Sequence, residues 1–381
     1  MRIALLGMGT VGGGVYELAA KKGIEVVRVL ERVRRTENAT TDIADIADDP
    51  RIEAVAEMMG GVEPAREYAL RCIRAGKHFV TANKLLISRC GIELAREAQN
   101  AGVRLVFSAA CGGGIPFLPS LVRARESDRI VRAGGILNGT TNYILDRMQR
   151  EGVDFASALA DAQALGYAER DPSGDIDGWD TARKVTLIAA VAFGALPSED
   201  EMPVMGIGNI RTEDVQAFKR KNLVCRLIGE TAKTEAGVTA CVRPVLFRVS
   251  DAESAVLRND NLCWYQGEQS GLFRLMGQGA GRYPTAANVL ADVLSLNAGL
   301  PPMLEEGLKP AALTRAAAEP YYVRVPGYAA ETLRTLLTGV SEAGEWRMGE
   351  TVPMEPAEIQ KIISALPGAF CAATVREGGK S

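Results

Sequence analysis

The chain has 381 residues, 47% of them hydrophobic and 24% charged, with a formal net charge of −3. This composition fits an ordinary globular protein of two or three domains, and it lacks the basic run that nucleic-acid binding needs. No segment approaches the ~18 uninterrupted apolar residues of a membrane span, and the seven scattered cysteines, without a Cys-x-x-Cys pair, indicate reduced core residues of a cytoplasmic protein.

A nucleotide-binding pattern opens the chain. An apolar strand is predicted from Arg2 to Leu6 and a helix to about Lys21, joined by Gly7-Met8-Gly9-Thr10-Val11-Gly12. In a G-x-G-x-x-G loop the first glycine makes a tight turn, the second lets a pyrophosphate approach the backbone and the third allows close packing of helix and strand. The alternative is a structural glycine turn, but the position between a strand and a helix favours dinucleotide binding.

The second predicted strand, residues 24–30, ends at Glu31-Arg32-Val33-Arg34-Arg35. An acid at this point would hydrogen-bond the ribose hydroxyls of NAD, whereas arginines would favour the 2′-phosphate of NADP. Both residue types occur, so the choice between NAD and NADP stays open. The three arginines tilt it toward NADP.

Strands and helices then alternate, which predicts a parallel, doubly wound sheet. The strand at 54–59 ends in Gly60-Gly61, and the strand at 77–81 ends in Thr81-Ala-Asn-Lys84, the edge where open α/β sheets place their ligands. The other elements predicted here are helices at 64–74 and 91–101 and a strand at 104–107.

A second, β-rich part follows the glycine-rich turn at 108–116. It contains a helix that opens at Asn138-Gly-Thr140, where capping is the simplest role for Thr140. Gly277 to Thr285 leads into an apolar helix, and a small α/β piece closes the chain. The predicted strands are at 130–136, 223–228, 237–242, 262–266, 271–276, 321–325 and 370–375, and the late helices are at 286–296 and 356–366.

The most acidic stretch of the chain lies between these parts, from Gly166 to Lys184. Asp177 is the expected N-cap of a largely apolar helix, on which Asp180 and Lys184 share one face. A surface ion pair is the alternative, but an apolar helix predicts burial, which lowers the pKa of a lysine and suits it to proton transfer. Because His78 is the only histidine, acid–base chemistry falls to other residue types.

The sequence resembles the homoserine dehydrogenase family from residue 1 to about residue 300. Seven short motifs, in the family's order, carry the resemblance: Gly7-x-Gly9-x-x-Gly12, Thr81-Ala-Asn-Lys84, Gly112-Gly-Gly-Ile-Pro116, Leu137-Asn-Gly-Thr-Thr-Asn-Tyr-Ile-Leu145, Gly166-Tyr-Ala-Glu-x-Asp-Pro172, Asp175-x-x-Gly-x-Asp-x-x-x-Lys184 and Gly277-x-Gly-Ala-Gly-x-x-Pro-Thr285.

The resemblance implies a homodimeric cytoplasmic enzyme of threonine and methionine biosynthesis that interconverts L-homoserine and L-aspartate 4-semialdehyde with NAD or NADP. Its fold would be a Rossmann-type sheet (1–115, completed by the helix at 278–302), an α+β catalytic and dimerisation domain (116–277) and a divergent ACT-like α/β unit (303–381). Lys184 would transfer the proton, and Lys84 would sit beside the nicotinamide and substrate. The implied substrate ligands are Glu169, Asp175, Asp180 and Thr140; the implied cofactor contacts are Gly7, Gly9, Thr10, Val11, Gly12, Arg32, Gly60, Lys84, Gly166 and Gly281.

Departures from the family pattern concern a cation and the tail. Ser108 stands where the family usually has Glu, which removes a charge from a Na⁺ or K⁺ site otherwise built from the carbonyls of Cys111, Gly113 and Ile115. In the tail, Tyr321-Tyr-Val-Arg-Val fits the first strand of an ACT unit, without a clear glycine-rich effector turn. Feedback by threonine therefore stays open.

Two other functions share part of this pattern. A dehydrogenase for another amino-acid semialdehyde would keep the lysines and vary the loops, and the intact set of Glu169, Asp175 and Asp180 argues against it. A non-catalytic dinucleotide sensor would keep the glycine loop and lose Lys84 or Lys184, and this chain has both.

Overall fold

The computed structural model describes residues 1–34 and 37–374 and divides the chain into two compact units that are interleaved in sequence. The first unit contains residues 1–133, 186–198 and 263–311, and the second contains 134–185, 199–262 and 312 onward. Arg35, one of the three arginines weighed for NADP, and Val375, the expected end of the last strand, lie outside the described residues. Among the described residues, no helix is long and apolar enough to cross a membrane.

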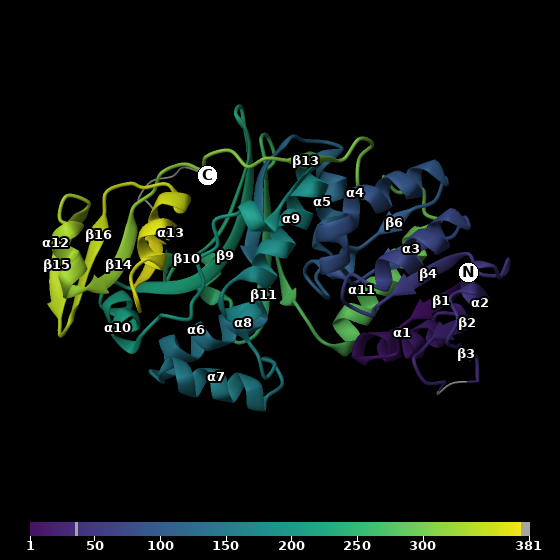
Figure 1. Cartoon of the computed structure of the whole chain (residues 1–381), viewed down its shortest axis with the longest axis horizontal. Coiled ribbons are helices and arrows are strands. Elements are labelled where there is room, and N and C mark those ends of the chain that lie inside the picture. Colours follow the sequence, from purple (N-terminus) through teal and green to yellow (C-terminus); the bar gives the residue numbers. More distant parts are fainter. Residues whose placement is uncertain (35–36, 375–381) are drawn as a thin grey trace. The chain divides into compact units, whose positions relative to one another are not determined.

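The first unit is built on a six-stranded sheet in the order β3-β2-β1-β4-β5-β6, in which neighbouring strands run parallel (Figure 1). Chain order reverses on either side of β1, which is the switch point where such sheets bind ligands. The predicted doubly wound sheet is thereby confirmed. Its strands are β1 (Arg2–Leu6), β2 (Glu25–Leu30), β3 (Ala39–Thr40), β4 (Ala54–Glu57), β5 (His78–Thr81) and β6 (Leu105–Val106).

Helix α11 (Arg282–Ser295) returns late in the sequence to pack on α1 (Thr10–Lys21), and Gly14 makes this possible: a Cβ there would lie 3.0 Å from Cβ of Ala286. The first unit also contains α2 (Ala44–Ala47), α3 (Ala65–Arg74), α4 (Lys84–Asn100), the 3₁₀ turn η1 (Ser108–Ala110), α5 (Phe117–Arg125) and the strand pair β8 (Ala195–Pro197) and β13 (Lys309–Ala311).

Helix α4 differs from its prediction, because it begins at Lys84 and not near residue 91. The side chain of Asn83 accepts a hydrogen bond from the backbone N–H of Leu86 at 3.1 Å and so caps the helix. This cap places Lys84 in the first turn, directly after the carboxyl end of β5.

The second sheet has nine strands in the order β12-β11-β7-β9-β10-β17-β14-β16-β15. They are β7 (Ile130–Ile136), β9 (Leu223–Thr234), β10 (Gly237–Arg248), β11 (Asp260–Gly267), β12 (Gly271–Gln278), β14 (Tyr321–Pro326), β15 (Leu337–Ala343), β16 (Trp346–Thr351) and β17 (Phe370–Thr374). The accompanying helices are α6 (Gly139–Glu151), α7 (Phe155–Ala164), α8 (Ser173–Ile176), α9 (Trp179–Phe193), α10 (Thr212–Arg220), α12 (Gly327–Thr332) and α13 (Pro356–Ser364), with 3₁₀ turns η2 (Glu199–Glu201) and η3 (Ala252–Ala255).

The C-terminal segment joins this sheet through β17, which pairs parallel with β10 and antiparallel with β14. A fully buried charge pair anchors it, since Nε of Arg324 donates to both carboxylate oxygens of Asp214 at 2.9 and 3.1 Å. The Arg324 guanidinium also lies 4.5 Å from the ring centre of Trp346, a cation–π distance. The ACT-like character of this segment stays a prediction.

Candidate active site

The glycine-rich loop after β1 combines closely packed glycines with one glycine that leaves open space. Gly7 has φ +99°, a conformation that glycine adopts readily, and a Cβ on Gly12 would lie 2.1 Å from the carbonyl oxygen of Gly7. Around Gly9, in contrast, nothing lies within 4 Å of an added Cβ. Gly9 is also the N-cap of α1 and offers no side-chain cap, so the N–H groups at this helix end suit an anion.

Alanine substitutions should therefore separate the roles of two of these glycines. We expect Gly9→Ala to leave the melting temperature unchanged and to weaken dinucleotide binding at least about tenfold, or about 1.4 kcal/mol, because only the ligand needs that space. Gly12→Ala should instead lower the melting temperature, since its methyl group collides with the loop backbone. Calorimetry on both variants checks this, and an unaltered Kd in Gly9→Ala would contradict it.

A buried carboxylate that the sequence did not indicate organises the neighbouring loops. Glu57, at the end of β4, is fully buried and accepts hydrogen bonds from the Thr81 hydroxyl at 2.5 Å and from the N–H groups of Met59 and Gly60 at 2.6 and 3.2 Å. Burial raises the pKa of this carboxyl. Gly60 has φ +75°, and no atom lies within 4 Å of a Cβ added there. Glu57 therefore holds in place a loop with open space beside Gly60.

Asn83 links this loop to Lys84. Its side-chain N–H donates to the carbonyl of Gly61 at 2.7 Å, while its side-chain oxygen caps α4. A sequence signal existed, because Asn is a preferred N-cap residue, but the helix was predicted to start seven residues later. Lys84 is half-buried at the beginning of that helix.

In the second unit, the predicted lysine–carboxylate pair is buried as expected. Lys184 and Asp180 are 9% and 8% exposed, and the Lys184 Nζ donates to a carboxylate oxygen of Asp180 at 2.7 Å and to the carbonyl of Leu137 at 2.6 Å. The surface-pair alternative is therefore wrong. The helix begins at Trp179, so Asp177 is not its N-cap; Asp177 instead follows the short helix α8 and is exposed.

Asn138 joins the two carboxylates of this cluster. Its side-chain N–H groups donate to Asp175 at 2.7 Å and to Asp180 at 2.8 Å, and its oxygen accepts from the N–H of Thr141 as the N-cap of α6. Burial, followed by the nearby charge of Asp180, raises the pKa of Asp175. The sequence predicted only that a helix opens at Asn138 and gave the capping role to Thr140; the bridge from Asn138 to both carboxylates depends on α6, α8 and α9 meeting in space.

The other predicted substrate residues are placed differently. The Thr140 hydroxyl donates to the carbonyl of Tyr167 at 2.6 Å, which ties the start of α6 to the loop that carries Gly166 and Glu169. Gly166 has φ +75° with open space around it, whereas Glu169 is exposed, and its carbonyl accepts from the Gln163 side chain. The Asn138 cluster includes Asp175, Asp180 and Lys184 but not Glu169 among the hydrogen bonds of the described residues.

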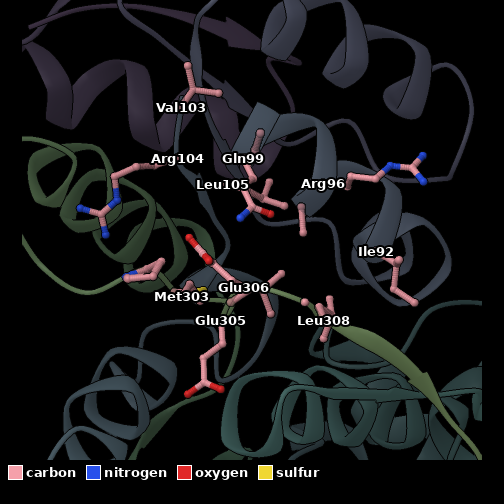
Figure 2. Close-up of a pocket in the computed structure, with 15 residues that line it drawn as sticks. Ile92, Arg96, Gln99, Val103, Arg104, Leu105, Met303, Glu305, Glu306 and Leu308 are labelled. Carbon is pink, nitrogen blue, oxygen red and sulfur yellow. The ribbon is translucent and has the colours of Figure 1, made fainter. Parts of the chain in front are cut away.

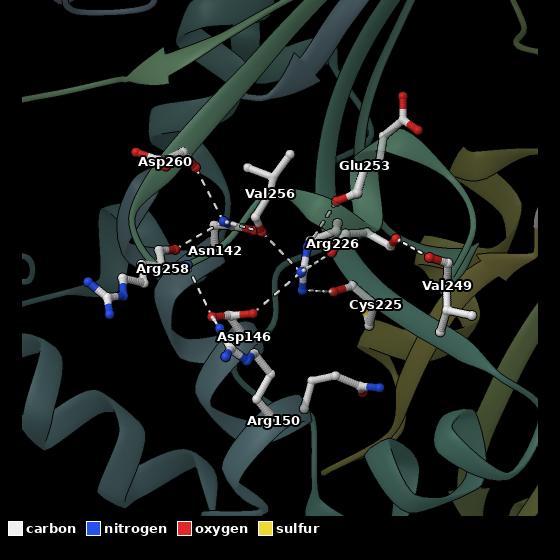
Figure 3. A network of polar contacts seen from close by, with 12 residues as sticks. Asn142, Asp146, Arg150, Cys225, Arg226, Val249, Glu253, Val256, Arg258 and Asp260 are labelled. Carbon is white, nitrogen blue, oxygen red and sulfur yellow. Dashed lines mark hydrogen bonds and ion pairs between the residues drawn. The ribbon is translucent and has the colours of Figure 1, made fainter.

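A buried polar network anchors α6 and thereby the position of Thr140 (Figure 3). The side-chain N–H groups of Asn142 donate to the carbonyls of Val256, Arg258 and Asp260 at 3.0–3.2 Å. One turn later, Asp146 lies 3.6 Å from the guanidinium of Arg226, which is 1% exposed. The helix is thus fixed to β9 and to the chain that follows η3.

The turn proposed for a cation lies in the first unit, beside α11. Gly281, an implied cofactor contact, is the N-cap of α11 with φ +119°. From this helix, the side-chain N–H of Asn288 donates to the carbonyl of Gly113 at 2.7 Å and to that of Ile115 at 3.4 Å. Two of the three carbonyls implied as cation ligands therefore already accept from an amide, so with the Asn288 amide oriented in this way the residues present do not fit a Na⁺ or K⁺ ion.

Asp292, one turn further along α11, is a buried acid that holds the start of this turn. It is 3% exposed and accepts from the N–H of Ser108 at 2.8 Å and from its hydroxyl at 2.5 Å. Burial raises the pKa of Asp292 from 3.8 to about 7. Because the pKa of Asp292 is higher in the folded than in the unfolded state, the folded state binds this proton more tightly. The resulting stabilisation is fully present below the unfolded pKa of about 3.8, and it is lost as the pH rises to about 7.

We therefore expect the stability advantage of the wild type over Asp292→Asn to shrink by up to about 4 kcal/mol between pH 4 and pH 8, at about 1.4 kcal/mol for each unit of pKa shift. Urea unfolding of both proteins across this range measures the difference. The substitution also changes the hydrogen bonds to Ser108, which adds an offset between the two proteins, and the change of the difference with pH reports the ionisation of Asp292. A difference that stays constant with pH would contradict the assignment.

A separate cavity of about 320 Å³ lies in the first unit, between α4 and residues 302–308 (Figure 2). Arg96, Arg104, Glu305 and Glu306 are among its charged lining residues. None of the residues predicted for cofactor or substrate lines it, so it does not belong to the candidate site.

Comparisons with known proteins match most of the chain. The family model "Homoserine dehydrogenase, NAD binding domain" matches residues 7–108, and the model "Homoserine dehydrogenase" matches residues 116–294. A homoserine dehydrogenase of Bacillus subtilis (strain 168) is 37% identical over 314 residues, which cover 78% of this chain and 72% of that protein.

Solved structures of homoserine dehydrogenases also match this chain. The crystal structure of a homoserine dehydrogenase from Thiobacillus denitrificans superposes with a TM-score of 0.87 at 30% identity and covers 99% of both chains. A hyperthermophilic archaeal homoserine dehydrogenase, solved in complex with NADPH, has a TM-score of 0.69 at 24% identity, with 79% of this chain and 99% of that one covered. At that identity the second match supports the fold alone.

Proposed function

The chain belongs to the homoserine dehydrogenase family, and on that premise we propose which residues carry out the interconversion of L-homoserine and L-aspartate 4-semialdehyde with a nicotinamide cofactor. The observation that supports the assignment best is the buried Lys184, whose Nζ is directed to Asp180 and to the Leu137 carbonyl. In the oxidative direction the neutral amine of Lys184 accepts the hydroxyl proton of homoserine and becomes an ammonium group; in the reductive direction the ammonium group returns that proton. A bound nicotinamide cofactor would supply the hydride acceptor for this oxidation.

The carboxylates hold the substrate's ammonium group in this proposal. Asp175 and Asp180 share the Asn138 amide, which fixes both side chains before substrate arrives. Glu169 supplies a third carboxylate from its loop, and Thr140 contacts the substrate carboxylate or hydroxyl. Lys84 completes the set at the start of α4, beside the nicotinamide and substrate.

We propose that the cofactor binds at the glycine loop and beside the glycines that leave open space. We also propose that the protein prefers NADP to NAD. Arg32 and Arg34 are exposed after β2 and suit a 2′-phosphate, whereas Glu31 suits ribose hydroxyls. The proposed contacts are Gly7, Gly9, Thr10, Val11, Gly12, Arg32, Gly60, Lys84, Gly166 and Gly281.

The proposed roles follow the predicted domains: residues 1–115 and 278–302 bind the nucleotide, 116–277 supply the substrate site, and 303–381 form the ACT-like unit.

We also propose a cytoplasmic homodimer that forms through the second sheet. Its edge strand β12 exposes Phe273 by 43% and Met276 by 61%, and an apolar sheet edge of this kind suits a second copy. Light scattering on wild type and on Met276→Lys tests this, and a wild-type monomer would exclude it.

The experiment that tests the function is cofactor reduction with L-homoserine, run separately with NAD and NADP. A faster reaction with NADP, reversed by Arg32→Ala, supports the role of the arginines. If neither cofactor is reduced while the protein still binds dinucleotide, the substrate is another semialdehyde or the protein is a sensor.

A further inference from the structure

The glycine-rich turn between β6 and α5 is held by side chains from a single face of α11. Asp292 accepts from the backbone and hydroxyl of Ser108, where the turn begins. Asn288, four residues earlier, donates to the carbonyls of Gly113 and Ile115, where the turn ends. Residues four apart share a helix face, so one helix fixes both ends of the turn.

The carbonyls that meet Asn288 are held in place by close packing. A Cβ on Gly113 would lie 2.2 Å from the carbonyl oxygen of Gly279, and one on Gly114 would lie 2.6 Å from Cβ of Pro284. Gly112 and Gly113 also have φ of +93° and +57°, which favour glycine. The carbonyls of Gly113 and Ile115 are therefore held in fixed positions. Both contact the side chain of Asn288, which is 5% exposed.

A pair of converging carbonyls needs a positive partner, and two kinds are available. A monovalent cation is one; an amide N–H₂ group is the other, since it carries two donors and no net charge. The charge balance here suits the amide, because Ser108 is neutral. The carboxylate of Asp292, which lies at the start of the turn, already accepts from Ser108 with both oxygens.

We propose that the Asn288 amide takes the place of a monovalent cation in this protein, so that the turn from Ser108 to Ile115 is stable without Na⁺ or K⁺. The competing arrangement uses the same residue in reverse. If the amide turned round, its oxygen would join the carbonyls of Gly113 and Ile115 as a ligand, and Asn288 would itself be part of a cation site. The two arrangements predict opposite effects of removing Asn288.

The test is thermal unfolding of the full chain in choline chloride, NaCl and KCl at equal ionic strength. This readout needs no turnover, so it stands apart from the proposed function. We expect the wild type to melt at one temperature in all three salts. Asn288→Ala should melt lower in choline and recover by at least about 2 °C in NaCl or KCl, because a cation can enter the vacated position.

Two results would overturn the proposal. A saturable rise of the wild-type melting temperature in Na⁺ or K⁺, lost in Asn288→Ala, would make Asn288 a cation ligand. An Asn288→Ala protein that melts alike in all three salts would show that the amide does not replace an ion.

Two further variants complete the design. Ser295→Ala removes a hydroxyl from the same helix, where it donates to the Asp292 carbonyl, and it should not respond to cations. If Asn288→Ala does not fold, Asn288→Asp takes its place: it sets a carboxylate against the two carbonyls and should gain stability in NaCl or KCl over choline. Absence of that gain would overturn the proposal as well.

Discussion

Lys184→Met is expected to lower kcat with L-homoserine by about a hundredfold to ten-thousandfold, the range that a positioned general acid or base contributes. Methionine has nearly the length of lysine, so it fills the same buried space, but it cannot exchange a proton with the substrate oxygen. The Kd for the dinucleotide should stay within about twofold, because the glycine loop belongs to a different part of the fold. Steady-state kinetics and cofactor titration measure both quantities.

Lys77 provides a matched control. It is another buried lysine, 4% exposed, and its Nζ donates to the carbonyls of Asp49 and Ile52 at 2.7 and 3.0 Å. Lys77→Met removes the same charge and its hydrogen bonds to these two carbonyls, so it should lower the melting temperature and leave kcat of the folded protein close to wild type. Retained turnover in Lys184→Met would refute the proposed proton transfer, whatever the control does.

Asp146→Ala should lower the free energy of unfolding by about 3–5 kcal/mol. The Asp146 carboxylate lies 3.6 Å from the Arg226 guanidinium and also accepts from the N–H of Arg258 at 3.0 Å. Both charged side chains are almost completely buried, so the substitution leaves the charge of Arg226 without its counterion in a medium of low dielectric constant. Urea unfolding measures the loss.

The double variant Asp146→Leu with Arg226→Met distinguishes this cause from simple loss of packing. Replacing both partners by apolar groups removes the unpaired charge, so the double variant should be more stable than Asp146→Ala. Glu331→Ala is the control: Glu331 pairs with Arg334 at 3.4 Å, both side chains are about four-fifths exposed, and the loss should be below about 1 kcal/mol. Equal losses in the buried and the exposed pair would contradict the explanation.

Local patterns were enough to predict the parallel sheet and the glycine loop, because both depend on residues that are neighbours in the chain. The run from Arg2 to Gly12 specifies strand, turn and helix through backbone conformation alone. The same holds for the pairing of Asp180 with Lys184, which one turn of helix brings together. Burial of that pair followed from the apolar helix that carries it.

Helix boundaries were less certain, because they depend on a single side chain. Asn83 moves the start of α4 to Lys84, and α9 starts after Gly178 and not at Asp177. In both places several polar residues could cap a helix, and tertiary contacts select one of them, as the bond from Asn83 to the Gly61 carbonyl illustrates.

The sequence by itself determined the family, the dinucleotide loop and the candidate proton-transfer lysine of this protein, since each is written in contiguous motifs. Only the tertiary structure decided how Asn138 bridges Asp175 and Asp180, why Glu57 is buried among loop N–H groups, and which side chain meets the carbonyls of Gly113 and Ile115. Asn288 is about 175 residues from that turn. Hydrogen bonds over such separations depend on how helices and loops pack, and no local spacing in the sequence encodes them.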